Sequence, residues 1–349
     1  MAISQSSYPQ QAFVEGQPTS SLRYDLIAAL LSCLGVVGAY LDLWAHTHIP
    51  QLETFFTPWH GVLYSSFLLY GGFLVATAIT NHNKGYSWLQ SMPRGYGLAL
   101  VGVFIYGLGG IGDMCWHLLF GIEKNIEALL SPTHLTLALG SFLMKTGPLR
   151  AAWQRDGSRT LHRWKELTPA LLSLFCMLAG FMFYTWYANP FAIPVPAITG
   201  QMGSNFLIQG LGVASIFLQT ALLIGPVLLI VRRWVLPFGA LTLVFTLTNL
   251  VVSVPQNTYF LLPVAILGGL GADLLLKFLK PTTTPGNAFH LFAFAVPVVL
   301  YLLYFLELAV VAGISWTIHM WMGSIVLAGI VSLLLSYLLQ PPRGASEEK

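Results

Sequence analysis

Apolar runs that are long enough to cross a lipid bilayer recur along the whole of this chain. A membrane-spanning helix needs about 20 mostly apolar residues, and about ten runs of that length can be marked in the 349 residues. With 56% hydrophobic residues, 8% charged residues and a mean hydropathy of +0.71, the composition excludes a soluble globular domain. The sequence therefore predicts an all-α, polytopic membrane helix bundle. The helices are expected at residues 25–47, 58–80, 97–120, 131–151, 167–188, 204–232, 236–254, 258–280, 288–312 and 314–340.

The basic residues are distributed unevenly over the connections between these helices. If the N-terminus is cytoplasmic, 15 of the 16 Lys and Arg residues lie on the cytoplasmic side, and Lys124 alone lies on the outer side. Positively charged loops are retained in the cytoplasm, so we expect both termini inside, in the plasma or inner membrane. The 15 residues are Arg23, Lys84, Arg94, Lys145, Arg150, Arg155, Arg159, Arg163, Lys165, Arg232, Arg233, Lys277, Lys280, Arg343 and Lys349.

This topology divides the chain into five segments. Residues 1–24 form a cytoplasmic tail, 25–151 a front half of four helices, 152–166 a basic cytoplasmic loop, 167–340 a back half of six helices, and 341–349 a second cytoplasmic tail. The first segment lacks the basic stretch and short apolar core of a secretory signal peptide, so the first helix is expected to be retained.

The front half contains a repeated polar pattern. GAYLDLWAH at residues 38–46 is matched by GGIGDMCWH at 109–117, and the runs TFFTPWH at 54–60 and ALLSPTH at 128–134 follow them. Each copy supplies an Asp, a His four residues later, and a second His at the start of the next helix. We therefore expect two helical hairpins of one design. Their polar residues are Asp42, His46 and His60 in the first copy and Asp113, His117 and His134 in the second.

Local geometry places the residues of each copy at a similar depth. The Asp and His that are four residues apart share one helix face. Pro58 and Pro132 suit the first turn of a helix, with Thr57 and Ser131 as N-caps, so the second His of each copy falls in that first turn. All six side chains are expected near the outer membrane surface.

These residue types in this arrangement indicate a metal site. An ionisable side chain at membrane depth costs about 2.5–3.5 kcal/mol on insertion scales and is usually directed at a partner inside the bundle. One carboxylate and two imidazoles supply oxygen and nitrogen ligands that suit copper, iron or zinc and leave room for a further ligand. Glu307 with His319 is expected as a third acid and imidazole pair, and Glu53 and Glu127 as additional ligands or neighbouring groups.

One protein family shows a similar pattern. Asp42-x3-His46-x13-His60 resembles the metal-binding pattern in the C subunit of the particulate methane and ammonia monooxygenases, and the likeness covers residues 38–145. In the second copy sixteen residues separate the histidines, and Asp113 stands where the family has Asn. The resemblance implies that each trio binds copper, which is thus the favoured metal, and that the protein acts on oxygen and a small substrate.

Two functions stay open. The first is a metal-dependent membrane oxidoreductase, similar to a monooxygenase, which takes a small molecule or metal ion from the outer face. The second is a proton- or metal-ion-coupled transporter or channel, in which Asp42, Asp113, Asp273 and Glu307 carry cations and the Gly-rich stretch 268–273 interrupts a helix. The lipid bilayer is a partner in either case, further membrane subunits are left open, and no nucleic acid is expected.

The residues also bear on other classes of site. His46 and His117 would suit bis-imidazole haem ligation, and the ligand types would also suit a zinc-dependent hydrolase. Cys33, Cys115 and Cys176 all fall inside expected spans, so a disulfide framework is not expected. The sequence contains no Gly-rich nucleotide loop, Cys-x2-Cys site or Ser-His-Asp pattern.

Overall fold

The computed structural model describes an all-helical chain. All the regular structure in the described ranges is helical, as the sequence predicts. The described residues are 15–49, 57–121, 126–155, 162–197, 205–281 and 286–340.

Eight of the described helices are long and apolar enough to cross a membrane. This agrees with a multi-pass membrane bundle. The long helices are α1 (Leu22–His48), α2 (Pro58–Asn83), α3 (Gly97–Phe120), α7 (Trp164–Tyr184), α9 (Phe206–Arg233), α11 (Leu262–Leu279), α12 (Asn287–Val311) and α13 (Ile318–Leu339). The shorter α-helices are α4 (Glu127–Leu130), α5 (Pro132–Lys145), α6 (Gly147–Gln154) and α10 (Ala240–Ser253).

The expected single helix over residues 131–151 is not observed. The structure divides this run into α5 and α6 at Thr146, whose ψ of 0° departs from helical geometry. Pro148 follows in the first turn of α6, where its missing N–H and fixed φ are tolerated but where it cannot continue the preceding helix. The run over 236–254 is likewise shorter than expected, because α10 begins only after Gly239, which has a φ of +91°.

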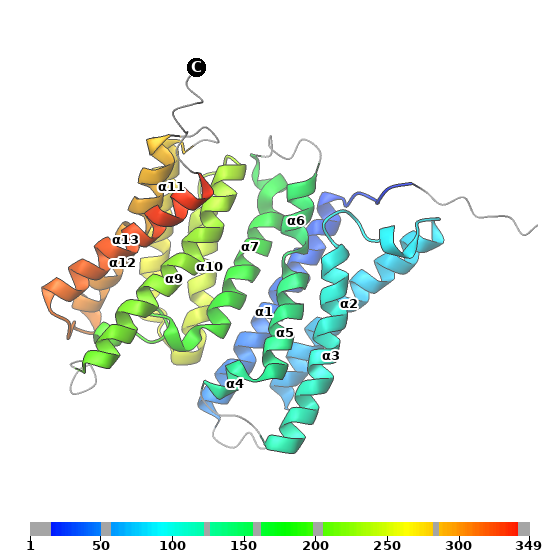
Figure 1. Ribbon diagram of the computed structural model, residues 1–349, viewed down its shortest axis with the longest axis horizontal. Coiled ribbons are helices and arrows are strands. Elements are labelled where there is room, and N and C mark those ends of the chain that lie inside the picture. The colour runs from blue at the N-terminus through cyan, green and yellow to red at the C-terminus, as the bar shows by residue number, and fades with distance from the viewer. Residues whose placement is uncertain are drawn as a thin grey trace, which may run out of the picture.

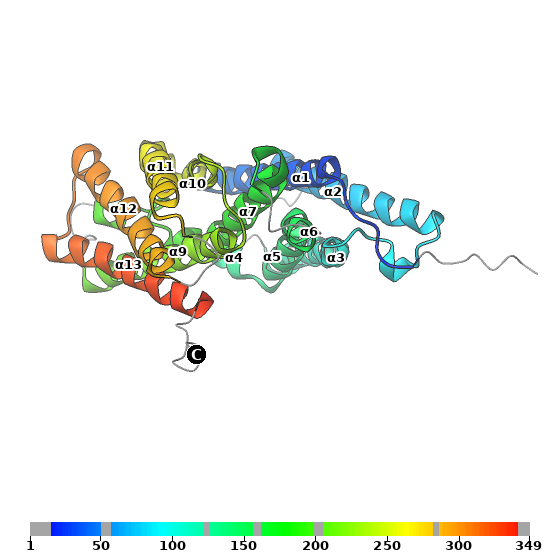
Figure 2. The same cartoon turned by 90° about the horizontal axis from the view of Figure 1, so that it is seen from above.

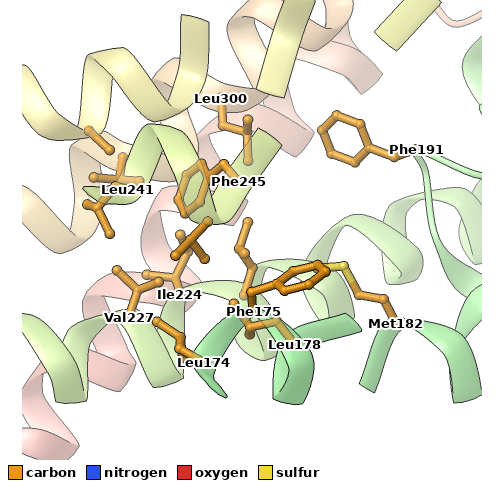
Figure 3. Close-up of a cluster of buried hydrophobic side chains, with 14 of the residues drawn as sticks. Leu174, Phe175, Leu178, Met182, Phe191, Ile224, Val227, Leu241, Phe245 and Leu300 are labelled. Carbon is orange, nitrogen blue, oxygen red and sulfur yellow. The ribbon is translucent and has the colours of Figure 1, made fainter. Parts of the chain in front are cut away.

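Helix α7 lies at the centre of the bundle (Figure 1). It contacts α1, α5 and α6 on one side and α9 and α10 on the other. Two-thirds of its apolar segment is buried inside the protein, more than in any other long helix described. Figure 3 shows its buried side chains meeting those of α9 and α10. The labelled residues in this core are Leu174, Phe175, Leu178, Met182, Phe191, Ile224, Val227, Leu241, Phe245 and Leu300.

The front half is built from two close helix pairs. Helix α1 packs on α2, and α3 packs on α5, and Figure 2 shows the two pairs as separate rows with α7 beside them. The backbones of α3 and α5 touch at Gly102 and Gly140: a Cβ atom on Gly140 would lie 2.8 Å from the carbonyl oxygen of Gly102. Small residues permit such contact between membrane helices, and each pair carries one of the predicted polar trios.

Candidate metal centre

The first cluster lies between α1 and α2. Oδ2 of Asp42 is 3.7 Å from Nε2 of His46, one turn later on α1, and 3.4 Å from Nε2 of His60 on α2. The N-cap predicted at Thr57 is confirmed, because its hydroxyl accepts a hydrogen bond of 3.1 Å from the backbone N–H of His60. Pro58 occupies the first turn as predicted. The local sequence therefore fixes where α2 begins and places His60 in its first turn.

The second cluster lies between α3 and α5. Oδ2 of Asp113 is 3.5 Å from Nε2 of His117, and its Oδ1 is 3.4 Å from Nε2 of His134. The N-cap predicted at Ser131 is also confirmed, since its Oγ accepts a hydrogen bond of 3.3 Å from the backbone N–H of His134. Thr133 donates a hydrogen bond of 3.0 Å to Oδ1 of Asp113 and so orients the carboxylate from the opposite helix.

The Nδ1 atoms of the second cluster are held by local oxygen atoms. Nδ1 of His117 is 3.3 Å from the carbonyl oxygen of Gly121, and Nδ1 of His134 is 2.6 Å from Oγ of Ser131. A proton on Nδ1 satisfies both contacts and leaves the lone pair on Nε2. Metal-binding histidines typically have such a partner on the second ring nitrogen, which fixes the ring and its tautomer. Both Nε2 atoms are thus directed at the same carboxylate.

The spacing within each cluster fits the edges of a metal coordination sphere. In each trio the ligand atoms lie within 4.8 Å of one another, and the carboxylate-to-imidazole distances are 3.4–3.7 Å. Direct N–H···O hydrogen bonds are shorter, at about 2.7–3.2 Å. Ligands bound tetrahedrally at about 2.0–2.2 Å from a metal ion are separated by about 3.3 Å. The observed distances therefore leave space for an ion between the three side chains.

The burial of the two carboxylates calls for a positive partner. Asp113 is 1% exposed and Asp42 is 9% exposed. Oδ1 of Asp42 is buried and has no hydrogen-bond partner among the described residues. Because an uncompensated polar atom in an apolar environment is unfavourable, this oxygen is a natural second ligand atom for a cation at the first cluster.

Both clusters open onto one cavity of about 130 Å³. All six residues of the two trios line it, together with mostly apolar and aromatic side chains. Tyr64 of α2 lies between the clusters. Its ring centroid is 6.3 Å from that of His60. Its hydroxyl is 3.5 Å from the point where a Cβ atom on Gly110 would lie, one turn before Asp113 on α3. One small molecule could therefore contact both clusters.

The other expected ligands are not brought into either cluster. Glu127 is exposed on α4. Glu307 is half-buried on α12, and His319 is exposed in the first turn of α13, where no ion pair joins the two. Helices α12 and α13 lie at the end of the bundle away from α2 and α3 (Figure 1). The prediction for Glu53 falls outside the described residues.

Sequence reasoning missed several residues that support the site. Tyr64 follows His60 by four residues and so shares its helix face, a signal that was present in the sequence. Thr133 is the variable residue of the Ser-Pro-x-His run, and nothing in that run indicates that it reaches α3. Tyr184 of α7 donates a hydrogen bond of 3.1 Å to the backbone oxygen of His134, which depends on tertiary packing.

Comparison with known proteins returns no relative. No protein-family model matches the chain, and no curated protein or solved structure gives a significant match. The functional argument therefore depends on the two clusters and their cavity.

Proposed function

We propose that this protein is a membrane metalloprotein that binds two transition metal ions, one in each Asp-His-His cluster. The observation that carries the proposal is the convergence of one carboxylate and two imidazoles in each trio, with the ligand atoms within 4.8 Å of one another, a spacing that fits the edge of a tetrahedral metal site. The unpartnered oxygen of Asp42 and the held Nδ1 atoms of His117 and His134 support the same conclusion. We regard the two hairpins as copies of one metal-binding design.

Two imidazoles and one carboxylate would bind copper, iron or zinc, and we favour copper. The similarity of Asp42-x3-His46-x13-His60 to the C subunit of the particulate methane and ammonia monooxygenases supports this choice. With three protein ligands, each ion keeps a position for a further ligand, and a redox-active ion there would supply one-electron chemistry. We propose an oxidoreductase with a small, largely apolar substrate.

The protein's own residues would perform two tasks around the ions. Thr133 and the N-caps Thr57 and Ser131 hold the ligands in position before any ion arrives, so little reorganisation is needed on binding. The aromatic wall of the cavity, which includes Tyr64 and Tyr106, limits access of water and favours an apolar substrate. We place this cavity toward the outer membrane face, with both termini in the cytoplasm.

The transporter interpretation receives less support from the buried acids. Asp273 of α11 is 1% exposed, and its carboxylate accepts hydrogen bonds from the backbone N–H groups of Leu241 and Thr242 and from the Thr242 hydroxyl. These contacts cap the start of α10, as a carboxylate at a helix N-terminus does. Asp273 thus has a structural role in joining α10 to α11.

Metal analysis of the detergent-purified full chain tests the proposal. After loading with Cu(II) and removal of loosely bound metal, we expect two copper ions per chain. His60→Ala and His134→Ala should each lower the content by one ion, and the double variant should bind almost none. His290→Ala is the matched control, because this histidine bonds to Ser336 in the back half and should retain both ions. Wild-type content below about 0.2 ions per chain would contradict the proposal.

A further inference from the structure

Three side chains from helices far apart in the sequence lie in the region where α1, α5 and α7 pack together. Sγ of Cys33 on α1 lies 3.5 Å from Sγ of Cys176 on α7. Lys145, the last residue of α5, reaches α7. Its Nζ lies 3.7 Å from the point where a Cβ atom on Gly180 would lie, and Gly180 is one turn beyond Cys176. Lys145 also lines the cavity of the metal clusters. The sequence analysis counted this lysine with the cytoplasmic charges, and the structure shows its side chain half-buried between helices.

The ammonium group of Lys145 has no acidic partner among the residues that the structure describes. Within the described ranges no carboxylate lies within ion-pair distance of it. An isolated charge inside a membrane bundle is strongly unfavourable and is normally compensated by a nearby group. Cys176 lies one turn before Gly180, which the ammonium group approaches, and Cys33 contacts Cys176, so a thiolate of this pair is the available counter-charge.

The contact between the two sulfur atoms allows one thiolate to be stabilised. At 3.5 Å one sulfur can donate an S–H hydrogen bond to the other, and the pair then shares one proton. A single thiolate with this shared proton carries a charge of −1, which balances the lysine ammonium. Cys176 is fully buried and Cys33 is half-buried, so water contributes little to the compensation. With this protonation the group of three would be neutral overall.

We propose that Cys33 and Cys176 bind one soft monovalent metal ion, Cu(I) or Ag(I), between their sulfur atoms in exchange for the proton that they share, with the sulfur atoms moving apart from 3.5 Å to admit it. Thiolates select soft ions, and binding forms two sulfur–metal bonds while one proton leaves. The charge of the group is unchanged, because one positive charge replaces another and no electron is transferred. A divalent ion such as Zn(II) would leave a net charge of +1 in apolar surroundings, so the site should reject it.

This site is separate from the Asp-His-His clusters in position and in chemistry. Cys33 precedes Asp42 by nine residues on the same helix, which corresponds to about 14 Å along its axis. Its ligands are sulfur atoms, whereas the clusters supply nitrogen and oxygen. The inference does not depend on the proposed function, since the site would bind Ag(I) even if the clusters bound no metal.

Silver binding to the full chain in detergent tests the inference. Cys115 is exposed, so Cys115→Ser removes the competing thiol and serves as the parent protein. Titration of the reduced parent with Ag(I) should give one tight site, seen by native mass spectrometry as one added silver and one lost proton. Adding Cys33→Ser or Cys176→Ser should weaken binding about 100-fold or more, and adding Lys145→Met about 10–100-fold, with Lys145→Arg largely retaining it.

A second measurement does not depend on the variants folding. X-ray absorption of the parent with one equivalent of Ag(I) should show a first shell of sulfur only, and excess Zn(II) should leave that shell unchanged. A nitrogen and oxygen shell, displacement by Zn(II), or equal silver affinity in the parent and in a folded Cys33→Ser variant would each overturn the inference. A disulfide between the two cysteines would make the parent protein about 2 Da lighter than the reduced chain. Finding this disulfide after isolation under reducing conditions would also overturn the inference.

Discussion

The close contact between α3 and α5 makes the second Asp-His-His cluster sensitive to a single methyl group. A Cβ atom on Gly140 of α5 would lie 2.6 Å from the backbone nitrogen and 2.8 Å from the Cα of Tyr106 on α3. These are backbone atoms, so no side-chain rotation can relieve the overlap. Ordinary contact begins at 3.4 Å, and Gly140→Ala must therefore separate the two helices by about 0.8 Å at this point, from 3.4 minus 2.6.

This separation acts directly on the ligand spacing. His134 lies six residues before Gly140, about 9 Å along α5, and it must meet the Asp113 carboxylate of α3. Metal–ligand distances tolerate deviations of about 0.2 Å, so a displacement of 0.8 Å exceeds the tolerance about fourfold. We expect Gly140→Ala to weaken metal binding at the second cluster by about 10–100-fold. The first cluster should be unaffected, because it lies between α1 and α2.

Competition between the protein and a chelator of known copper affinity measures this effect. The wild type should show two copper ions per chain at a chelator concentration where Gly140→Ala retains one. Gly72→Ala is the matched control, since a Cβ on this exposed α2 glycine would meet nothing within 4 Å. A folded Gly140→Ala protein that binds both ions as tightly as the wild type would refute the reasoning, and so would selective loss of the ion at the α1–α2 cluster.

Three further substitutions have defined outcomes. Thr133→Val removes the hydrogen bond that orients the second-cluster carboxylate. It should weaken copper binding at that cluster about 10-fold or more in the same chelator competition. Thr136→Val is the control, because it loses only a hydrogen bond within its own helix and should leave copper binding unchanged. Asp273→Asn should lower the free energy of unfolding by about 1–3 kcal/mol, measured by denaturation in detergent, and retain both ions; loss of metal would show that it serves the centre. Tyr96→Phe removes a buried hydrogen bond of 2.8 Å to Asp25 and should cost about 1.5–3 kcal/mol of stability; an unchanged denaturation midpoint would contradict this role.

The two clusters could be predicted from the sequence because each depends on local geometry and on one hairpin contact. The spacing of four residues fixes the Asp and His on one face, and the caps at Thr57 and Ser131 fix the next His in a first turn. Connecting consecutive helices is then sufficient to bring each trio together. Glu307 and His319 matched the same residue types, but neither a shared face nor a capped turn placed their side chains against each other.

The buried faces of the helices could not be predicted from the sequence, because the bilayer removes the usual signal of which helix face lies inside the bundle. In water, apolar residues mark the buried face, but lipid is as apolar as leucine. On α2, Leu68 is 67% exposed to the surroundings of the bundle whereas Leu74 is fully buried, and their residue type does not distinguish them. Small residues, which let helices approach closely, and ionisable residues, whose exposure to lipid is unfavourable, are the signals that remain.

The same argument explains why Cys33, Lys145 and Cys176 were not connected in the sequence analysis. Two cysteines in apolar runs carry no periodic signal, because a thiol is accepted equally well by lipid and by protein. Lys145 does carry such a signal, but its position near the end of a helix also fits a cytoplasmic loop. The structure adds a contact that the sequence does not show, because it places Nζ of Lys145 3.7 Å from the point where a Cβ atom on Gly180 of α7 would lie. Cys176, one turn before Gly180, and Cys33, which contacts Cys176, are therefore in position to act as partners of this lysine.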